Sequence, residues 1–268
     1  MTTLKIFDMN LMSLQKSFLY FSVMLLIGCK IQPVENINAV GGGVAITFDD
    51  NFIDEWYDIH NILKEYNWRA TFFVSNFHQL DSSKIEKLNI LKEYGHEIGG
   101  HGLNHVNAKK YVLENGITSY LENEIYPMKQ IMAENGFHVT SFAYPFGAKN
   151  NKIDVALLNE FKMIRGTTAE SWKLFIKRRI EKLTCRSCFP NLLYGIGIDY
   201  SPEIDMPYIK SLMKKAKDKN KVAVFFAHET VEKVDNDYQI TYQRLIEICE
   251  YINENKMKFL LITDLHEK

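Results

Sequence analysis

Two adjacent carboxylates stand out as residues whose types and position suit chemistry. Asp49 and Asp50 follow strand-like residues in the stretch AITFDDN, where a buried strand is expected to reach solvent. Neighbouring side chains on a strand point to opposite faces of the sheet. The two carboxylates therefore need share neither an environment nor a task.

A pair of histidines adds candidate metal ligands. His101 and His105 lie in the stretch GGHGLNH, and a spacing of four lets both imidazoles meet one ion where the segment turns helically. Two histidines with one carboxylate leave a coordination position open for water. Glycines at 99, 100 and 102 let the backbone fold tightly around the pair. Taken alone, such a pair is weak evidence for a metal site, because most pairs with this spacing are surface or core histidines.

Two further stretches place polar groups at the ends of apolar runs. In AYPFG, Pro145 and Gly147 require a sharp turn, and a backbone N–H freed there could donate to a developing oxyanion. A simple turn is the alternative. His228 ends the apolar run VAVFFAH, a position that suits either a structural or a catalytic histidine.

The elements that must position these residues form an alternating series. Short β-branched or aromatic runs predict strands at 44–48, 69–74, 97–101, 141–145, 161–166, 222–228 and 258–263. Segments of helical period predict helices near 54–66, 83–94, 117–135, 151–159, 205–218 and 240–254. This βαβ pattern predicts an α/β fold with about seven parallel strands closed, or nearly closed, into a barrel, whose chemistry lies at the carboxyl ends of the strands. Residues 167–204 are irregular and are expected to form a long insertion beside the site.

Composition excludes several classes of protein. The 268 residues are 46% hydrophobic and 24% charged with a formal net charge of -1, which is typical of globular proteins and shows no basic bias that would point to nucleic acid. An apolar run over 18–27 precedes Gly28 and Cys29. That run is short for a transmembrane helix and is typical of a signal peptide.

The ending LIGC of this run resembles a bacterial lipobox. We therefore expect residues 1–28 to be a lipoprotein signal peptide, Cys29 to be lipidated, residues 29–43 to be a flexible tether, and 44–268 to be the folded domain. The three other cysteines are Cys185, Cys188 and Cys249. The stretch CRSC favours a local disulfide or two unpaired thiols, because the sequence has no second such pair to complete a structural zinc site.

The ordered motifs TFDD, HxxxH, YPFG and a hydrophobic strand ending in histidine resemble the polysaccharide deacetylase family, carbohydrate esterase family 4. The resemblance runs from about Val44 to about Thr263. It implies a distorted (β/α) barrel and a metal-dependent deacetylase. It also implies that Asp49 is the general base and that Asp50, His101 and His105 bind one divalent metal ion, with zinc favoured and cobalt, nickel or manganese as alternatives.

The same resemblance assigns roles on the other side of the reaction. The backbone N–H of Phe146 matches the family's oxyanion donor, and His228 matches its general acid. Tyr144 and Pro145 are expected to contact substrate. Trp172, in the irregular region, is a candidate for stacking on a sugar or for a place in the core.

Departures from the family pattern concern the groups that orient the base and the acid. Asn51 stands where glycine is common, and Ala143 where an arginine commonly orients the base. We hypothesise that Arg165, on the next strand, supplies the missing guanidinium. The aspartate that partners the catalytic histidine has no clear equivalent, and Asp199 and Glu170 are the nearest candidates.

These expectations predict a hydrolase that removes N-acetyl groups from polysaccharide containing N-acetylglucosamine. One alternative is an O-acetyl ester hydrolase acting on a polysaccharide such as xylan, and another is a catalytically inactive glycan-binding lipoprotein. The expected partners are the acetylated polysaccharide and, through Cys29, a membrane, with no nucleic acid. We expect a monomer in the bacterial cell envelope.

Overall fold

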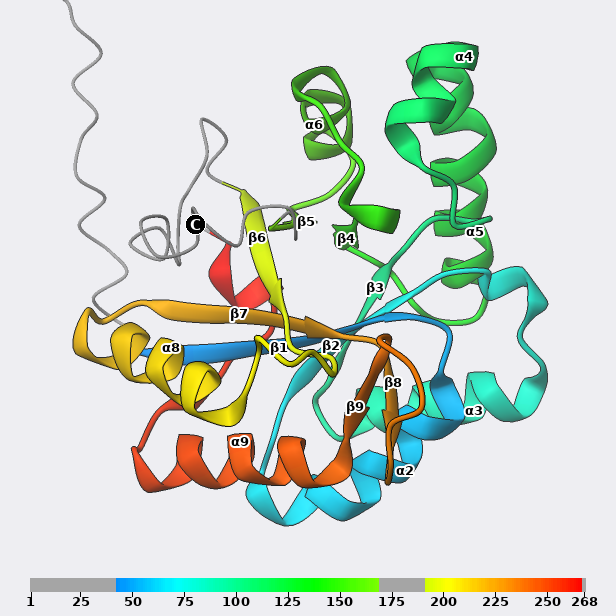
Figure 1. Ribbon diagram of the computed structural model, residues 1–268. Coiled ribbons are helices and arrows are strands. Elements are labelled where there is room, and N and C mark those ends of the chain that lie inside the picture. The colour runs from blue at the N-terminus through cyan, green and yellow to red at the C-terminus, as the bar shows by residue number, and fades with distance from the viewer. Residues whose placement is uncertain (1–41, 169–190, 267–268) are drawn as a thin grey trace, which may run out of the picture. The chain divides into compact units, whose positions relative to one another are not determined.

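The computed structural model describes residues 42–168 and 191–266. Seven parallel strands form its centre, each leading into a turn or helix (Figure 1). They are β1 (Gly43–Asp50), β2 (Ala70–Val74), β3 (Glu97–Gly100), β4 (Ser141–Ala143), β5 (Met163–Thr167), β6 (Leu192–Gly197) and β7 (Val222–Ala227).

These strands close into a barrel. They pair in the order of the chain from β1 to β7, and β7 returns to pair with β1 in parallel over residues 43–48 of β1. A short strand, β10 (Lys258–Phe259), pairs with the first residues of β1, below the point where β2 joins that strand. The predicted α/β barrel of about seven strands is therefore confirmed.

Helices lie outside the strands. They are α2 (Ile53–Leu63), α3 (Ser82–Glu93), α4 (Ala108–Tyr120), α5 (Tyr126–Glu134), α6 (Asn151–Leu158), α8 (Met206–Asp218) and α9 (Tyr242–Glu254). Figure 1 shows α8 and α9 running side by side, and α8 contacts both β1 and β7. Among the described residues, no helix is both long enough and apolar enough to cross a bilayer.

Alternation along the strands separates two cores. On β1, Ile46 and Phe48 face the large core between strands and helices, whereas Ala45 belongs to a smaller cluster with Phe73 and Ala143. Side chains two residues apart share a face of a strand. This places Asp49 on the Ala45 side, where the smaller cluster fills the barrel interior.

Two strand predictions were wrong in an informative way. The segment 258–263 was expected to be a barrel strand, but only Lys258–Phe259 form a ladder. The barrel strand missing from the prediction is β6, which lies between β5 and β7 and falls in the region 167–204 that was expected to be irregular. Its glycines weaken the strand signal, yet a Cβ on Gly195 would lie 3.1 Å from the ring of Phe226 and 3.3 Å from the side chain of Arg165.

The segment predicted as one helix over 117–135 is also more complex. An earlier helical stretch begins at Ala108, the backbone breaks at Gly116 with φ 85°, and a π-turn over Leu121–Ile125 joins it to α5. A parallel pair, β8 (Glu229–Val231) and β9 (Gln239–Thr241), follows β7. The π-turn contacts the loop that follows β3, through a hydrogen bond between Glu124 and Asn104. Strand β8 begins directly after His228, the residue that follows β7.

Candidate active site

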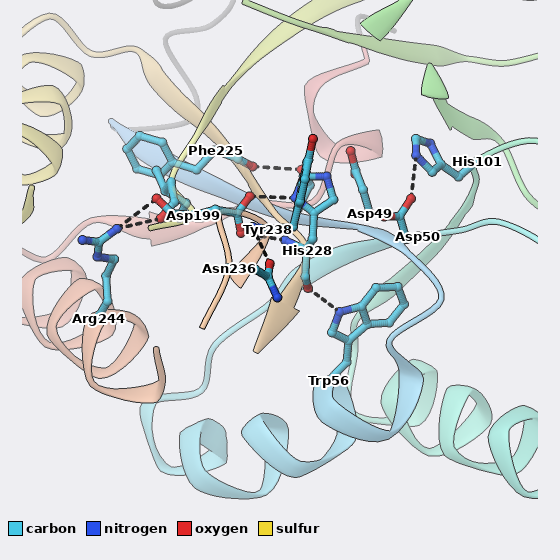
Figure 2. Close-up of polar contacts among 12 residues, drawn as sticks. Asp49, Asp50, Trp56, His101, Asp199, Phe225, His228, Asn236, Tyr238 and Arg244 are labelled. Atoms are coloured by element: carbon cyan, nitrogen blue, oxygen red, sulfur yellow. Dashed lines mark hydrogen bonds and ion pairs between the residues drawn. The ribbon is translucent and has the colours of Figure 1, made fainter. Parts of the chain in front are cut away.

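The candidate metal ligands converge at the carboxyl end of β1. The Asp50 Oδ1 atom lies 3.0 Å from His105 Nε2 and 3.5 Å from His101 Nε2. Figure 2 shows the contact between Asp50 and His101. One donor atom from each residue falls within 4.8 Å of the other two. Asp50 reaches this position because its φ of 85° turns the end of β1 away from regular strand geometry.

The tautomer of His101 fits metal binding. Its Nδ1 donates to the carbonyl oxygen of Ala143 at 2.9 Å, and because a carbonyl only accepts, the proton is on Nδ1. Nε2 faces Asp50: when protonated it donates a hydrogen bond to that carboxylate, and when unprotonated it offers its lone pair to a metal ion. A bond such as that from Nδ1 orients a histidine ligand and raises its basicity. The three donors therefore fit one divalent cation, held by two imidazoles and one carboxylate.

A buried carboxylate on the π-turn holds the loop that carries His105. Glu124 accepts from the Asn104 backbone N–H at 2.9 Å and from the Asn104 side-chain amide at 2.7 Å. Gly102 has φ 83° and His105 has φ 52°, so this short loop is tightly turned. The sequence analysis missed Glu124, since nothing in its local pattern distinguishes it from exposed acidic residues of the same segment.

The electrostatics of Asp50 favour its ionised form. Burial by itself raises the pKa of this carboxyl, but hydrogen bonds from His101 and His105 lower it further than burial raises it. The net effect holds the pKa of Asp50 well below its ordinary value. The carboxylate is therefore a ready metal ligand.

Asp49 occupies a different environment, inside the top of the barrel. Its side chain is buried, and both carboxylate oxygens accept from Nη2 of the fully buried Arg165 at 2.6 and 2.5 Å. The guanidinium carbon lies 5.3 Å from the ring centre of Phe73 and 5.0 Å from that of Phe226. Ala143 on β4 and Arg165 on β5 are register partners. The guanidinium of Arg165 therefore comes from the strand next to Ala143, the position where the resemblance leads us to expect an arginine.

His228 follows β7 and is fixed on three sides. Its Nδ1 lies 2.7 Å from Asp199 Oδ2, its backbone N–H donates to Asp199 Oδ1 at 3.0 Å, and its carbonyl accepts from Trp56 Nε1 at 2.9 Å. Figure 2 shows this group beside Asp49. Of the two candidate partners predicted for the histidine, Asp199 makes the contact, and Glu170 lies outside the described residues.

Burial and Asp199 shift the pKa of His228 in opposite directions. Burial alone lowers the pKa of His228, but the hydrogen bond and charge of Asp199, with smaller contributions from Asp49 and Asp50, raise it to about 9. Burial raises the pKa of Asp199. His228 is therefore protonated at neutral pH, as a proton donor must be.

A family model described as polysaccharide deacetylase matches residues 38–164. This segment includes the adjacent carboxylates and the histidine pair that the fold brings together. Over this segment, which is slightly less than half of the chain, the sequence is similar to the polysaccharide deacetylase family. The match stops before Arg165, Asp199 and His228, whose placement comes from the structure alone.

Curated relatives of this family match a similar part of the chain. The Bacillus cereus peptidoglycan-N-acetylglucosamine deacetylase is 34% identical over 112 residues, 41% of this chain and 49% of the relative. YxkH of Bacillus subtilis, named as a polysaccharide deacetylase, is 28% identical over 116 residues, 41% of this chain and 38% of the relative. The chain therefore spans half or less of the length of the relatives it matches.

Solved structures share the barrel over most of the chain. A family 4 carbohydrate esterase of Streptococcus mutans has a TM-score of 0.54 at 15% identity, covering 85% of this chain and 90% of that one. A family 4 pseudoenzyme from Bacillus anthracis has a TM-score of 0.52 at 16% identity, covering 84% of this chain and 66% of that one. At these identities the likeness concerns the fold alone.

The YPFG segment of the family forms the predicted turn. The N–H groups of Gly147 and Ala148 donate to the carbonyls of Tyr144 and Pro145, and Phe146 adopts φ 58°. A Cβ on Gly147 would lie 2.0 Å from Thr167 Oγ1, so glycine is required there. The Phe146 ring is 68% exposed.

Two substrate-contact predictions for this segment do not fit the structure. The Tyr144 side chain is fully buried and its hydroxyl donates to Asp154 at 2.9 Å, so it packs in the core and does not face substrate. Pro145 is buried as well. Trp172 and Cys29 lie outside the described residues, as do Cys185 and Cys188.

Proposed function

We propose that this protein is a metal-dependent deacetylase that removes N-acetyl groups from polysaccharide containing N-acetylglucosamine. One observation carries the proposal. A trio of metal donors, a carboxylate paired with a buried arginine and a histidine paired with an aspartate meet at one end of the barrel. The name of the Bacillus cereus relative supports the choice of glycan.

The chain's own residues divide the work of the reaction. Asp50, His101 and His105 would hold a divalent cation, which would supply Lewis-acid polarisation of the acetyl carbonyl and activation of water. Asp49, held by Arg165, takes a proton from water as the water oxygen forms a bond to the carbonyl carbon. The two neighbouring aspartates thus have different tasks.

The second half of the reaction uses groups from other strands. The backbone N–H of Phe146 donates to the oxygen that becomes negatively charged in the tetrahedral stage. As the carbon–nitrogen bond breaks, protonated His228 gives its Nε2 proton to the leaving amine. Asp199 keeps the Nδ1 proton in place and stabilises the imidazolium, and acetate and the free amine are the products.

Two contacts support an active enzyme over an inactive glycan-binding protein. The inactive alternative was motivated by Ala143 and by the lack of a clear partner for the histidine. Arg165 lies against the base, and Asp199 lies against the acid. Both departures from the family pattern are therefore compensated by residues of other segments.

The test is acetate release by the full-length protein from N-acetylglucosamine oligomers, peptidoglycan and acetylated xylan, with and without chelator. We expect release from the first two, loss of release with chelator, and loss in the Asp49→Asn variant with metal content unchanged. Release from xylan alone would replace the amide proposal with the ester alternative. Glycan binding by metal-loaded protein without acetate release would overturn the enzymatic proposal.

We further propose that the protein is exported and lipid-anchored through Cys29. Support comes from the apolar run that ends in LIGC and from the polar residues that follow it. Labelling of cells with a radioactive or clickable fatty acid should mark the wild-type protein and not the Cys29→Ser variant. Labelling of both proteins alike would contradict the assignment of Cys29.

A further inference from the structure

The loop after the acid His228 is held in one shape by its own side chains. Gln239 Oε1 accepts from the backbone N–H groups of Asp235 and Asn236 at 2.8 and 3.3 Å, and Gln239 Nε2 donates to Glu229 at 2.7 Å. Asn236 Oδ1 accepts from the Tyr238 N–H at 2.8 Å. These bonds hold the backbone at Tyr238, whose carbonyl also accepts from the Glu229 N–H at 3.1 Å.

Tyr238 combines high exposure with contact to the site. Its side chain is 66% exposed, yet its ring centre lies 5.4 Å from that of His228 at an interplanar angle of 86°. Figure 2 shows the tyrosine standing beside the histidine. An aromatic ring has an apolar face that a ligand can cover, and at Tyr238 this exposed ring lies beside the histidine that we propose as the acid.

A second exposed aromatic residue lies on the metal side of the site. The ring centre of Phe146 lies 4.6 Å from that of His105. The acid and one candidate metal ligand thus each carry an exposed aromatic ring, supplied by separate loops. A ligand that spans the reacting centre would meet an aromatic surface at each end.

We propose that Tyr238 is a carbohydrate platform on which a pyranose ring of the substrate stacks at the acid side of the site. One face of a pyranose carries mainly C–H groups, which pack against an aromatic ring, while its hydroxyls remain in water. Such stacking would hold the leaving nitrogen near His228. This inference rests on the proposed function for the identity of the sugar, and nothing in the local sequence distinguishes Tyr238 from other exposed tyrosines.

The experiment compares Tyr238→Ala with Tyr238→Phe in the full-length, metal-loaded protein. Binding of the N-acetylglucosamine tetramer is measured by calorimetry in an Asp49→Asn background, and acetate release gives kcat and KM. We expect Tyr238→Ala to weaken binding and raise KM about 3- to 10-fold, the usual effect of one aromatic contact. Tyr238→Phe, which keeps the ring, should remain within about 2-fold of the parent.

Two controls separate sugar contact from support of the acid. Hydrolysis of a small aryl acetate, which has no sugar, should change by less than about 2-fold in Tyr238→Ala if the ring acts on the glycan. Tyr126→Ala removes an exposed tyrosine of α5 that bonds Glu160, and it should leave tetramer binding unchanged. These measurements require a folded protein, which unchanged aryl acetate turnover reports.

Three results would overturn the platform. They are unchanged tetramer binding in Tyr238→Ala, an equal loss of aryl acetate turnover, and no tetramer binding by the parent. Failure of the proposed function would look different, because acetate would then be released from no glycan although calorimetry still reported binding. In that case the calorimetric comparison alone decides the role of Tyr238.

Discussion

At the scale of single residues, the buried ion pair between Asp49 and Arg165 positions the carboxylate that we propose as the general base. Arg165 Nη2 bonds the carboxylate, while Nε and Nη1 have no hydrogen-bond partner among the residues that the structure describes. Burying an ion pair gives little net stability, because desolvation offsets the attraction. The pair instead fixes the position of the carboxylate that we propose as the general base.

Replacing Arg165 by lysine tests this role. Lysine keeps the charge but lacks the planar fork that fixes a carboxylate. We expect kcat to fall about 10- to 100-fold, since small misplacement of a reacting group has effects of that size. Metal content should stay unchanged.

The matched control is Arg69→Lys, which makes the same change in the exposed pair with Asp264. It should leave kcat unaltered. Wild-type turnover in Arg165→Lys would show that Asp49 does not depend on the guanidinium. Lost metal in that variant would show a general disturbance of the site in place of a specific effect on the base.

A second prediction concerns the aspartate that faces His228. Without its charge, only burial and the more distant carboxylates act on the histidine, so the pKa of His228 should fall from about 9 toward or below its ordinary value. A general acid is active only below its pKa. For Asp199→Asn, the alkaline limb of the kcat/KM profile should therefore move to lower pH, with about a 10-fold loss at pH 7.5.

The measurement is kcat/KM for the tetramer between pH 5 and pH 10. Asp205→Asn serves as a control, because Asp205 caps α8 and, among the residues that the structure describes, its carboxylate accepts from the Tyr208 backbone N–H of that helix. An alkaline limb at the same pH in Asp199→Asn and in wild type would exclude His228 as the titrating acid.

At the scale of elements, the sequence predicts what is encoded locally. TFDD and HxxxH predicted the candidate metal donors near strand ends, because alternation along a strand and short-range spacing can be read from adjacent residues. Strand β6 was missed because Gly195 makes room for Phe226, a contact between segments far apart in the chain. Glu124 and Tyr238 were missed for the same reason. Their contacts with Asn104 and His228 form only in the folded protein.

The π-turn gives the third prediction. Glu124→Gln keeps one oxygen acceptor for Asn104 but puts an N–H donor against another donor, which should loosen the loop that carries His105. Changes to residues that orient metal ligands commonly weaken metal binding about 10- to 100-fold. We expect that loss in a competition titration with a fluorescent chelator.

Glu122→Gln is the matched control, because Glu122 is an exposed residue of the same turn. At saturating metal, kcat of Glu124→Gln should return close to the wild-type value, since the catalytic groups are unchanged. Equal metal affinity in Glu124→Gln and wild type would mean that the loop holds its shape without the carboxylate.

At the scale of the whole molecule, a buried histidine pair near the opposite ends of the strands links stability to pH. The Ala70 N–H donates to His96 Nδ1, so the proton of His96 is on Nε2, which lies 3.0 Å from His60 Nδ1. His60 must then carry its proton on Nε2, and that buried atom has no partner in the described part of the chain. Neither ring can accept a second proton without leaving a buried charge.

Burial consequently lowers the pKa of His96 to about 3 and also lowers that of His60. Because the unfolded chain binds a proton near pH 6.5 and the folded chain does not, the contribution of His96 to stability is complete above pH 6.5. It is lost progressively as the pH falls toward 3. From pH 7 to pH 5, His96 alone should lower the free energy of unfolding by about 2 kcal/mol.

His228 works in the opposite direction, because its raised pKa stabilises the fold below about pH 6.5 and that contribution is lost as the pH rises through about 9. The decisive quantity is therefore the difference in pH dependence between a variant and wild type, measured by urea unfolding at pH 5 and pH 7. His96→Asn, whose amide oxygen can accept from Ala70, should be less stable at pH 7 but lose about 2 kcal/mol less on acidification. His78→Asn, at an exposed histidine, should show the same pH dependence of the free energy of unfolding as wild type. If His96→Asn also showed the wild-type pH dependence, the fold would tolerate charge on the buried histidine pair.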